Sequence, residues 1–497
     1  MRKAKREMEK YQMLIGGQWR GSSSNDWFET INPYSGESWA LIPNGTATDV
    51  DAAVQAAYAA FKHGTWATSK PSARGRLLCR LADIILEHAD KLARLEVRDN
   101  GKLFAEMSGQ VKYLAEWYRY YGGYCDKIEG TVIPSDKEQI FNFTRHEPLG
   151  VIACITPWNS PLLLLAWKLA PALAAGNTAV IKPSEYTSAS TLAFARLFAE
   201  AGFPDGVVNV VTGFGASVGL PLVQHTLVAK IAFTGSDSTG QAIYAEAARQ
   251  LKTVTLELGG KSPNIIFADA NIDNAVNGAI SGIFAASGQT CIAGSRLLLQ
   301  RSIHDEVVDR IADFAASAII GDPMQPSTQV GPVTTPDQFQ KVMHYINIAQ
   351  EEGATCRLGG HSIDSLPGGQ FVAPTMFTGV HNKMRIAQEE VFGPVLAVIP
   401  FDDEEEAVAI ANDSPYGLAA GVWTKDMALA LRMSERLEAG TVWINTYRAV
   451  SFTSPFGGYK RSGIGRESGI EAMNHFLQTK SVWINMADRV DNPFILR

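Results

Sequence analysis

The sequence predicts an α/β protein built on a doubly wound parallel sheet, with a second α/β unit and a small separate β element. From Gly150 onward, short apolar runs rich in β-branched residues alternate with helix-like segments, which is the pattern of βαβ crossovers. Two glycine-containing turns, 213–219 and 233–240, each join such a run to a helix. A third observation is that two strand-like stretches, 130–150 and 479–486, stand apart from this alternation.

The first part of the chain is predicted to be helical. Apolar residues recur with helical spacing over 48–62 and 73–125, and Gly101 and Gly122-Gly123 are read as stop signals. The basic start, Met1 to Lys10, is not followed by an apolar run and is expected to be a solvated tail rather than a targeting segment.

The predicted main sheet begins after these helices. Its strands are 151–155, 178–182, 207–211, 228–233 and 253–258, and its helices are 162–175, 188–201, 216–225 and 238–250. Ligands of such sheets bind at the carboxyl ends of the strands. The expected functional rim is therefore 156–159, 182–185, 212–213 and 234–236.

The second α/β pattern runs from Asp273 to about Thr446, with a helix at 274–286, a strand at 297–300, a helix at 304–318 and a helix start in the acidic run 402–406. The strand-like stretches 130–150 and 479–486 need partners for their backbone groups. We expect them to form an oligomerisation element.

Composition limits the class of function. The chain has 497 residues and a net charge of −7, which offers no positive field for nucleic acid or an anionic membrane. The longest apolar run, 161–175, contains Lys168 and is too short to span a bilayer. Five widely spaced cysteines without a CxxC pair argue against disulfides and metal clusters. We therefore predict a cytoplasmic location and no metal site.

Cys291, in the stretch Gly288-Gln289-Thr290-Cys291, is the candidate nucleophile. A thiolate attacks carbonyl carbons readily near neutral pH, and Glu257 in Leu256-Glu257-Leu258-Gly259-Gly260-Lys261 supplies a possible base. A lone cysteine is more often a small core residue, so the hypothesis depends on the residues around it. The pair predicts carbonyl chemistry through a covalent adduct.

The two glycine turns are candidate dinucleotide-binding loops. The first has the spacing GxGxxxG instead of GxGxxG and, taken alone, is more often a tight turn. In the second, Gly235 permits close approach, and the amides at the helix start could hold a pyrophosphate. Two such turns at one sheet edge favour a Rossmann-like dinucleotide site.

Three further side chains complete the candidate site. Glu185 suits a ribose diol beside Lys182 and would repel the extra phosphate of NADP, which favours NAD, although NADP remains possible and a plain polar loop is the alternative. Asn159 could stabilise an oxyanion together with the Cys291 backbone N–H, or simply form a turn. Glu390 is either a helix start or a carboxylate for a second ribose.

In combination, these residues resemble the NAD(P)-dependent aldehyde dehydrogenase superfamily, in its hydrolytic branch. The matching motifs are PWNSP at 157–161, KPSE at 182–185, FTGS at 233–236, LELGGK at 256–261, GQTC at 288–291, EEVFGP at 389–394 and PFGGYKRSGIGRE at 455–467. The resemblance implies Cys291 as nucleophile, Glu257 as general base, Asn159 as oxyanion donor and Lys168 on a proton relay. The expected cofactor-binding residues are Ile155, Thr156, Pro157, Trp158, Lys182, Ser184, Glu185, Gly215, Gly219, Phe233, Thr234, Gly235, Ser236, Leu258, Gly259, Glu390 and Phe392.

The resemblance also implies a substrate mouth. Its expected residues are Ser160, Trp167, Arg448, Phe452 and Phe456. Relatives often have an aromatic residue where Ser160 stands, so a roomier pocket for a bulky aliphatic, aromatic or semialdehyde substrate is expected. Arg448 either pairs with a substrate carboxylate or is simply solvated. Gln478 replaces a family glutamate, which leaves Glu257 as the one obvious base, and Ile292 replaces a further cysteine of some relatives.

The expected organisation follows from these assignments. Residues 1–129 and 151–256 would form the dinucleotide-binding domain, 257–446 the catalytic domain, 130–150 and 479–497 the oligomerisation element, and 447–478 the substrate-mouth loop and its return. A small aldehyde is the expected substrate, and a homodimer or homotetramer the expected assembly. The alternatives are a coenzyme A-acylating dehydrogenase, a cofactor-independent thiol esterase and a non-catalytic protein with the same fold.

Overall fold

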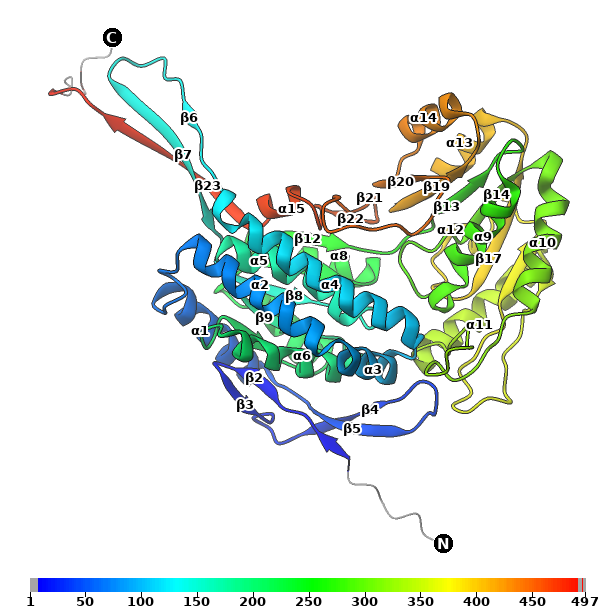
Figure 1. The fold of residues 1–497 in the computed structure, drawn as a ribbon, viewed down its shortest axis with the longest axis horizontal. Coiled ribbons are helices and arrows are strands. Elements are labelled where there is room, and N and C mark those ends of the chain that lie inside the picture. Colours follow the sequence, from blue (N-terminus) through cyan, green and yellow to red (C-terminus); the bar gives the residue numbers. More distant parts are fainter. Residues whose placement is uncertain (1–7, 490–493, 495–497) are drawn as a thin grey trace, which may run out of the picture.

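A computed structural model describes residues 8–489 and 494 of the chain. Its largest sheet has eight strands in the order β22-β12-β11-β8-β9-β10-β2-β3 (Figure 1). These strands are β22 (Gly463–Ile464), β12 (Thr253–Glu257), β11 (Val228–Thr234), β8 (Val151–Ile155), β9 (Thr178–Lys182), β10 (Val208–Val210), β2 (Met13–Ile15) and β3 (Gln18–Arg20). The central five, from β12 to β10, are parallel, which confirms the predicted fold class.

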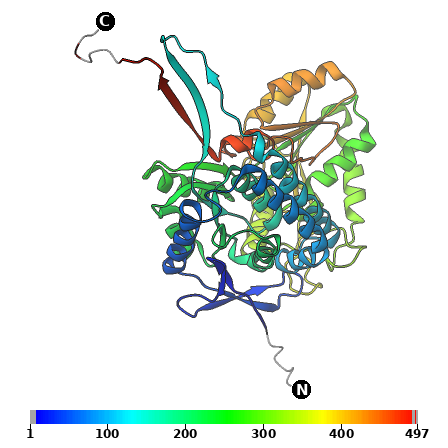
Figure 2. The same ribbon diagram turned by 60° about the vertical axis from the view of Figure 1, so that its left-hand side comes forward.

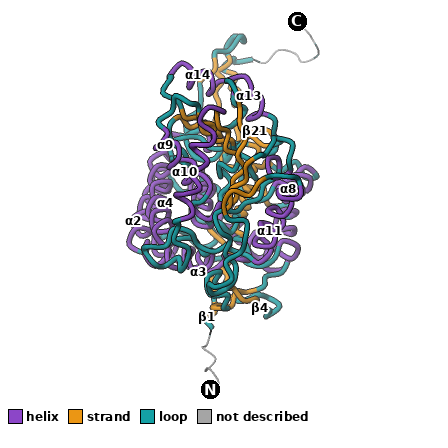
Figure 3. Tube along the Cα trace, turned by 90° about the vertical axis from the view of Figure 1, so that its right-hand side faces the viewer, coloured by secondary structure: helices purple, strands orange, loops and turns teal. Residues whose placement is uncertain are grey.

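The strand order reverses at β8, whose neighbours are β9 and β11. Alternate β8 residues pack on opposite faces: Val151, Ala153 and Ile155 on one, Ile152 and Cys154 on the other. Helices cover both faces, as Figure 3 shows for α2, α4 and α8. One face is covered by α1 (Ala47–Lys62), α7 (Leu220–Gln224) and α8 (Asp237–Ala248), and the other by α2 (Pro71–Glu87), α3 (Ala89–Asn100), α4 (Phe104–Tyr124), α5 (Pro161–Ala175) and α6 (Ser188–Ala201).

Most predicted helix ends agree with the structure because local capping sets them. Gly101 ends α3 and Gly176 ends α5, each in the left-handed conformation that glycine adopts without strain. The stop predicted at Gly122-Gly123 is wrong, since α4 continues to Tyr124. Gly122 lies against the Cys79 sulfur and the Gly75 carbonyl of α2, so this glycine allows two helices to pack closely. The helix predicted over 216–225 is also wrong in part, because Gly215–Gly219 forms a π-type turn before α7.

A second sheet has the order β15-β16-β17-β14-β13-β19-β20, and its strands are parallel except for β15. Its strands are β13 (Pro263–Ile266), β14 (Arg296–Gln300), β15 (Thr355–Leu358), β16 (Thr375–Thr378), β17 (Val395–Phe401), β19 (Ala419–Trp423) and β20 (Thr441–Ile444). The helices between them are α9 (Ile272–Ile283), α10 (His304–Ala316), α11 (Pro336–Glu351), α12 (Arg385–Gln388), α13 (Glu404–Asn412) and α14 (Met427–Arg436).

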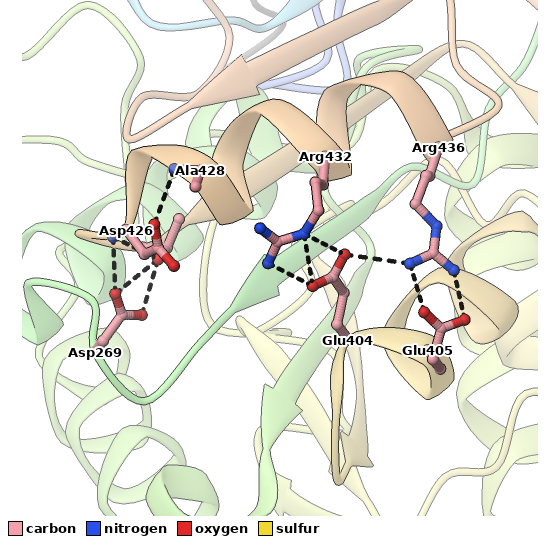
Figure 4. A network of polar contacts seen from close by, with 8 residues as sticks. Asp269, Glu404, Glu405, Asp426, Ala428, Arg432 and Arg436 are labelled. Carbon is pink, nitrogen blue, oxygen red and sulfur yellow. Dashed lines mark hydrogen bonds and ion pairs between the residues drawn. The ribbon is translucent and has the colours of Figure 1, made fainter.

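The acidic run at 402–406 starts α13, as predicted, and it also holds α14 in place. Arg432 binds Glu404, and Arg436 binds both Glu404 and Glu405 (Figure 4). Asp403 caps the first turn of α13 by accepting a hydrogen bond from the Glu406 amide. These ion pairs lie at the surface, where each contributes little to stability.

Among the described residues, three smaller strand groups lie outside the main sheets, and two of them pack on the body. The N-terminal group is β1 (Glu9–Lys10), β4 (Trp27–Ile31) and β5 (Ser38–Pro43), so the end of the predicted tail, Glu9–Lys10, pairs with β5; residues 1–7 lie outside the described part. The other is a two-stranded pair, β18 (Tyr416–Gly417) with β21 (Tyr459–Lys460). The short helix α15 (Glu471–Asn474) leads into β23.

The two stretches predicted to need partners pair with each other. β6 (Val132–Ile133), β7 (Ile140–Pro148) and β23 (Leu477–Asn485) form an antiparallel sheet, which Figure 2 shows as an arm extending from the body. The strand starts at Leu477 rather than Thr479, and residues 490–493 and 495–497 of the predicted element lie outside the described part. Apolar side chains on this arm are exposed, namely Val132, Ile133, Phe141, Trp483, Ile484 and Met486. Within the described residues, no helix is both long and apolar enough to cross a membrane.

Candidate active site

Cys291 lies in the loop between α9 and β14 and is partly buried. Burial, with the nearby carboxylates of Glu390 and Glu257, raises the pKa of its thiol to about 12, while the Lys102 ammonium opposes this shift. The thiol is therefore protonated in the resting site and needs a base to become a nucleophile. Its backbone passes close to β12, because the Cys291 carbonyl oxygen would lie 2.6 Å from a Cβ placed at Gly260.

Glu257 ends β12 and is 4 % exposed. Neither of its carboxylate oxygens has a hydrogen-bond partner among the described residues. Burial, and secondly repulsion from Glu467, hold the pKa of Glu257 well above its usual range, against the attraction of Lys168 and Arg466. A raised pKa makes the deprotonated carboxylate a stronger proton acceptor, as a general base requires.

Lys168 is fully buried on α5, so it is not a surface charge with an extended side chain. Its ammonium forms an ion pair with Glu467 and donates to the Thr234 hydroxyl at 2.5 Å. Glu467 is one of the residues near the site that the sequence did not predict. Its signal was present, since Glu467 closes the motif 455–467, but pairing of β22 with β12 is what brings it beside Glu257.

Glu467 provides a second buried carboxylate next to Glu257, but it is paired with Lys168, so Glu257 as the base stays a prediction. Gln478 has no such position. It lies on β23, and its amide donates to the Pro148 carbonyl at 3.2 Å.

Asn159 precedes α5, and its side-chain amide donates to the Gln289 carbonyl at 3.0 Å. The second N–H of this amide stays available to another acceptor. Asn159 and Cys291 line one cavity of about 120 Å³. The other lining residues are Pro157, Trp158, Leu164, Thr234, Gly235, Ser236, Leu258, Gly259, Gln338, Lys341, Glu390 and Phe392.

Two contacts shape the wall of this cavity. Trp158 and Phe392 meet edge to face, with ring centroids 5.3 Å apart. The Glu390 carboxylate accepts a hydrogen bond from the Gly260 amide at 3.0 Å, and a Cβ at Gly259 would lie 2.6 Å from the other Glu390 oxygen. Glycine at 259 thus allows Glu390 to approach β12.

A longer cleft of about 650 Å³ follows the carboxyl ends of the strands at the point where their order reverses. Its lining includes thirteen residues of the predicted cofactor set: Ile155, Thr156, Pro157, Trp158, Lys182, Ser184, Glu185, Gly215, Gly219, Phe233, Thr234, Gly235 and Ser236. The remaining four line the cavity that contains Cys291, which we call the thiol cavity: Leu258, Gly259, Glu390 and Phe392. The two hollows are continuous, because Pro157, Trp158, Thr234, Gly235 and Ser236 line both.

The cleft fits an elongated nucleotide in size and in its polar groups. A Cβ at Gly215 would meet no protein atom within 4 Å, so packing within the chain does not require this glycine. Ser236 caps α8, whose N-terminus opens onto the cleft. Lys182 and Glu185 form an ion pair at 3.1 Å on the same wall.

Among the residues predicted for the substrate mouth, the structure brings aromatic side chains of three segments together. Trp167 of α5 stacks on Trp117 of α4 with centroids 5.7 Å apart and meets Phe456 edge to face. Phe452 packs against Trp117 and Tyr113. Trp117 and Tyr113 were not predicted for the site, although their spacing of four residues places them on one face of a helix.

Ser160 and Arg448 each bind a charged side chain of this chain. Ser160 is buried, and its hydroxyl accepts a hydrogen bond from the Lys102 ammonium at 3.2 Å. Arg448 forms an ion pair with Glu106 of α4 at 3.3 Å, and both side chains are 19 % exposed. Arg448 is therefore neither a free cation nor a simply solvated one.

Comparison with known proteins agrees with this geometry. The model of the aldehyde dehydrogenase family matches residues 19–482. An aldehyde dehydrogenase of Aspergillus niger is 46 % identical over 96 % of this chain and 95 % of its own length, and a phenylacetaldehyde dehydrogenase of Pseudomonas fluorescens is 44 % identical over 95 % and 96 %. The structure of an aldehyde dehydrogenase from Bacillus cereus in complex with NAD+ superposes with a TM-score of 0.95 at 45 % identity, covering 96 % of this chain and 97 % of that one. The chain therefore belongs to the aldehyde dehydrogenase family.

Proposed function

We propose that the protein oxidises an aldehyde to its carboxylate with NAD, with Cys291 as nucleophile. The observation that supports this best is the continuity of the thiol cavity with the long cleft through five shared residues. A dinucleotide in the cleft would then end beside the thiol, with Asn159 on the same wall. Family membership supports the same reaction.

The chemistry divides into two halves. The Cys291 thiol releases its proton to solvent and its sulfur bonds to the aldehyde carbon, while the Asn159 amide and the Cys291 backbone N–H stabilise the oxyanion. A nicotinamide bound at the end of the cleft would accept the hydride that leaves this carbon, and a thioester on Cys291 would result. Glu257 then takes a proton from a water molecule, whose oxygen attacks the thioester carbon. The carbon–sulfur bond breaks, and the carboxylate and the thiolate separate.

The nucleotide end of the cleft favours NAD over NADP. Glu185 presents a carboxylate that can accept hydrogen bonds from a ribose diol, and it would repel a phosphate on that ribose. Lys182, paired with it at 3.1 Å, holds the carboxylate in place. Ser236 and the N-terminus of α8 would hold the pyrophosphate.

Pre-steady-state kinetics test the two halves separately. We expect Glu257→Gln to keep a burst of about one NADH per active site, because only water activation is lost, while steady turnover falls about 10²–10⁴-fold. Cys291→Ala should lose the burst itself, whereas Cys154→Ala, a buried thiol on β8, serves as the matched control and should keep both phases. Acid that formed only with coenzyme A, or without NAD, would contradict the proposal.

The pH profile tests the position of Glu467. Glu257 acts when deprotonated, so turnover falls as the pH drops below its raised pKa. Since Glu467 is among the groups that raise this pKa, Glu467→Gln should move the acid limb of kcat to lower pH by on the order of one unit. The other charged groups around Glu257 are Lys168 and Arg466, and the titratable Cys291 thiol also lies near it. Glu471→Gln on α15 is the exposed control; an unmoved limb in Glu467→Gln would be evidence against this coupling.

We propose an apolar, ring-bearing aldehyde as substrate. The stacked and edge-to-face contacts of Trp117, Trp167, Phe452 and Phe456 support a binding wall suited to an aromatic ring. The relative from Pseudomonas fluorescens is named for phenylacetaldehyde. A semialdehyde is the weaker candidate, because Glu106 already neutralises Arg448.

Two variants separate these substrate classes. Phe452→Ala should lower kcat/KM for phenylacetaldehyde about tenfold more than for acetaldehyde, since only the larger substrate loses ring contact. Arg448→Ala should leave the ratio between anionic and neutral aldehydes unchanged. A selective loss of activity toward succinic semialdehyde in Arg448→Ala would favour the semialdehyde instead.

We propose that the arm formed by β6, β7 and β23 joins copies of the chain into a dimer or tetramer. Its edge strands carry backbone groups that another chain can pair, and its exposed apolar side chains favour burial. A cytoplasmic location remains a proposal that is supported by the number and spacing of the cysteines in the sequence.

Sedimentation tests the arm. The double substitution Trp483→Lys and Ile484→Glu should shift the protein to a smaller species, because both side chains are exposed on β23 and charge there disfavours burial. Leu431→Lys, an exposed apolar position on α14, is the control and should leave the assembly intact. An unchanged sedimentation coefficient in the double variant would refute the role of the arm.

A further inference from the structure

The loop that leads to Cys291 has a strained backbone. Ala286, Ser287 and Gly288 follow one another with φ values of 53°, 52° and 69°, a left-handed conformation that side chains other than glycine seldom adopt. A Cβ at Gly288 would collide with the Gly393 carbonyl, so that position accepts only glycine. A strained conformation of this kind persists only where surrounding contacts hold it.

Gln289 provides the main contacts that hold this loop. It is 1 % exposed, and both the oxygen and the nitrogen of its side-chain amide form hydrogen bonds with the segment 331–334. Its oxygen accepts from the Thr334 amide at 2.9 Å, and its nitrogen donates to the Pro332 carbonyl at 3.3 Å. The segment is itself anchored, because the Thr334 hydroxyl donates to the Asn100 carbonyl at 2.6 Å.

The backbone of the same residue holds the oxyanion donor. The Gln289 carbonyl accepts one N–H of the Asn159 amide at 3.0 Å. Because the amide group is planar, fixing one N–H also fixes the direction of the other. Cys291 follows Gln289 by two residues and lines the same cavity as Asn159. One residue therefore connects the position of the sulfur with the orientation of the oxyanion donor.

We infer that Gln289 is a positioning residue that fixes the Asn159 amide and the Cys291 sulfur in their positions relative to each other. Its side chain fixes the peptide, the peptide carbonyl orients the Asn159 amide, and the remaining N–H of that amide is directed toward the forming oxyanion. This inference rests on the proposed reaction, in which Asn159 stabilises the oxyanion.

A double-mutant cycle tests this link. Gln289→Met keeps the length of the side chain and removes both hydrogen bonds, and we expect it to lower kcat/KM about 10²-fold. Asn159→Ala should lower it about 10²–10³-fold. Because Gln289 acts through Asn159, the double variant should lie within about tenfold of Asn159→Ala alone. KM for NAD should stay within twofold of the wild-type value in all three variants.

Ser287→Ala is the matched control. Its hydroxyl anchors the same loop to the same segment, through the Gly331 carbonyl at 2.8 Å, but does not bond the peptide that holds Asn159. The fold-losses of activity in Ser287→Ala and in Asn159→Ala should therefore multiply in the corresponding double variant. If Gln289→Met fails to fold, Gln289→Glu replaces it, since Glu keeps the acceptor for the Thr334 amide and should show a smaller loss with the same non-additivity.

The outcomes distinguish a failure of the proposed oxidation from a failure of the positioning role of Gln289. A wild-type protein without NAD-dependent aldehyde oxidation would overturn the proposed function. An active wild type in which Gln289→Met has full activity, or in which the losses at Gln289 and Asn159 multiply, would overturn the positioning role alone. The same result follows if Ser287→Ala and Gln289→Met are equally non-additive with Asn159→Ala, because the effect would then be a general disturbance of the loop.

Discussion

The burial of a carboxyl group at the end of β12 is the constraint on which the site depends. Removing Glu257 from water raises its pKa, and a carboxylate so placed needs compensating charge nearby. On α5, Lys168 supplies that positive charge. Glu467, in the segment that follows the edge strand β22, forms an ion pair with this lysine and repels Glu257, so it opposes the compensation. The main sheet, the helix packed on it and the segment that returns to its edge thus bring three charged groups together: Glu257, Lys168 and Glu467.

Much of the fold could be predicted because its signals are local. Alternation of strands and helices, and glycines that end helices at 101 and 176, act within one or two turns of chain. Gly122 shows the limit: it looks like a stop signal, yet contact with Cys79 and Gly75 of α2 explains it, and a tertiary contact leaves no local signal. The N-terminal strands β1, β4 and β5 were not predicted for the same reason, since they pair with one another outside the main sheet.

The candidate site divides in the same way. Cys291, Glu257 and Asn159 stand in motifs whose residue types suggest chemistry by themselves. Glu467 and Arg448 acquire their roles from partners 299 and 342 residues away, Lys168 and Glu106, and no pattern along the chain specifies such pairs. Arg448, expected either to pair with a substrate carboxylate or to be solvated, is instead paired with Glu106, and Glu467, for which no role was predicted, neighbours Glu257.

The junction between the body and the arm has a consequence for how this chain can diverge. Only nine residues, 468–476, lie between Glu467 and the start of β23. Both ends of this stretch are hydrogen-bonded to the body, because Trp117 donates to the Ser468 hydroxyl and Asn177 donates to the Phe476 carbonyl. An insertion there would displace the buried Glu467 carboxylate, whereas the turn between Ile133 and Ile140 lies at the far end of the arm. Among descendants of this sequence, insertions and deletions should therefore accumulate in the turn between Ile133 and Ile140 and be absent from the stretch between Glu467 and β23.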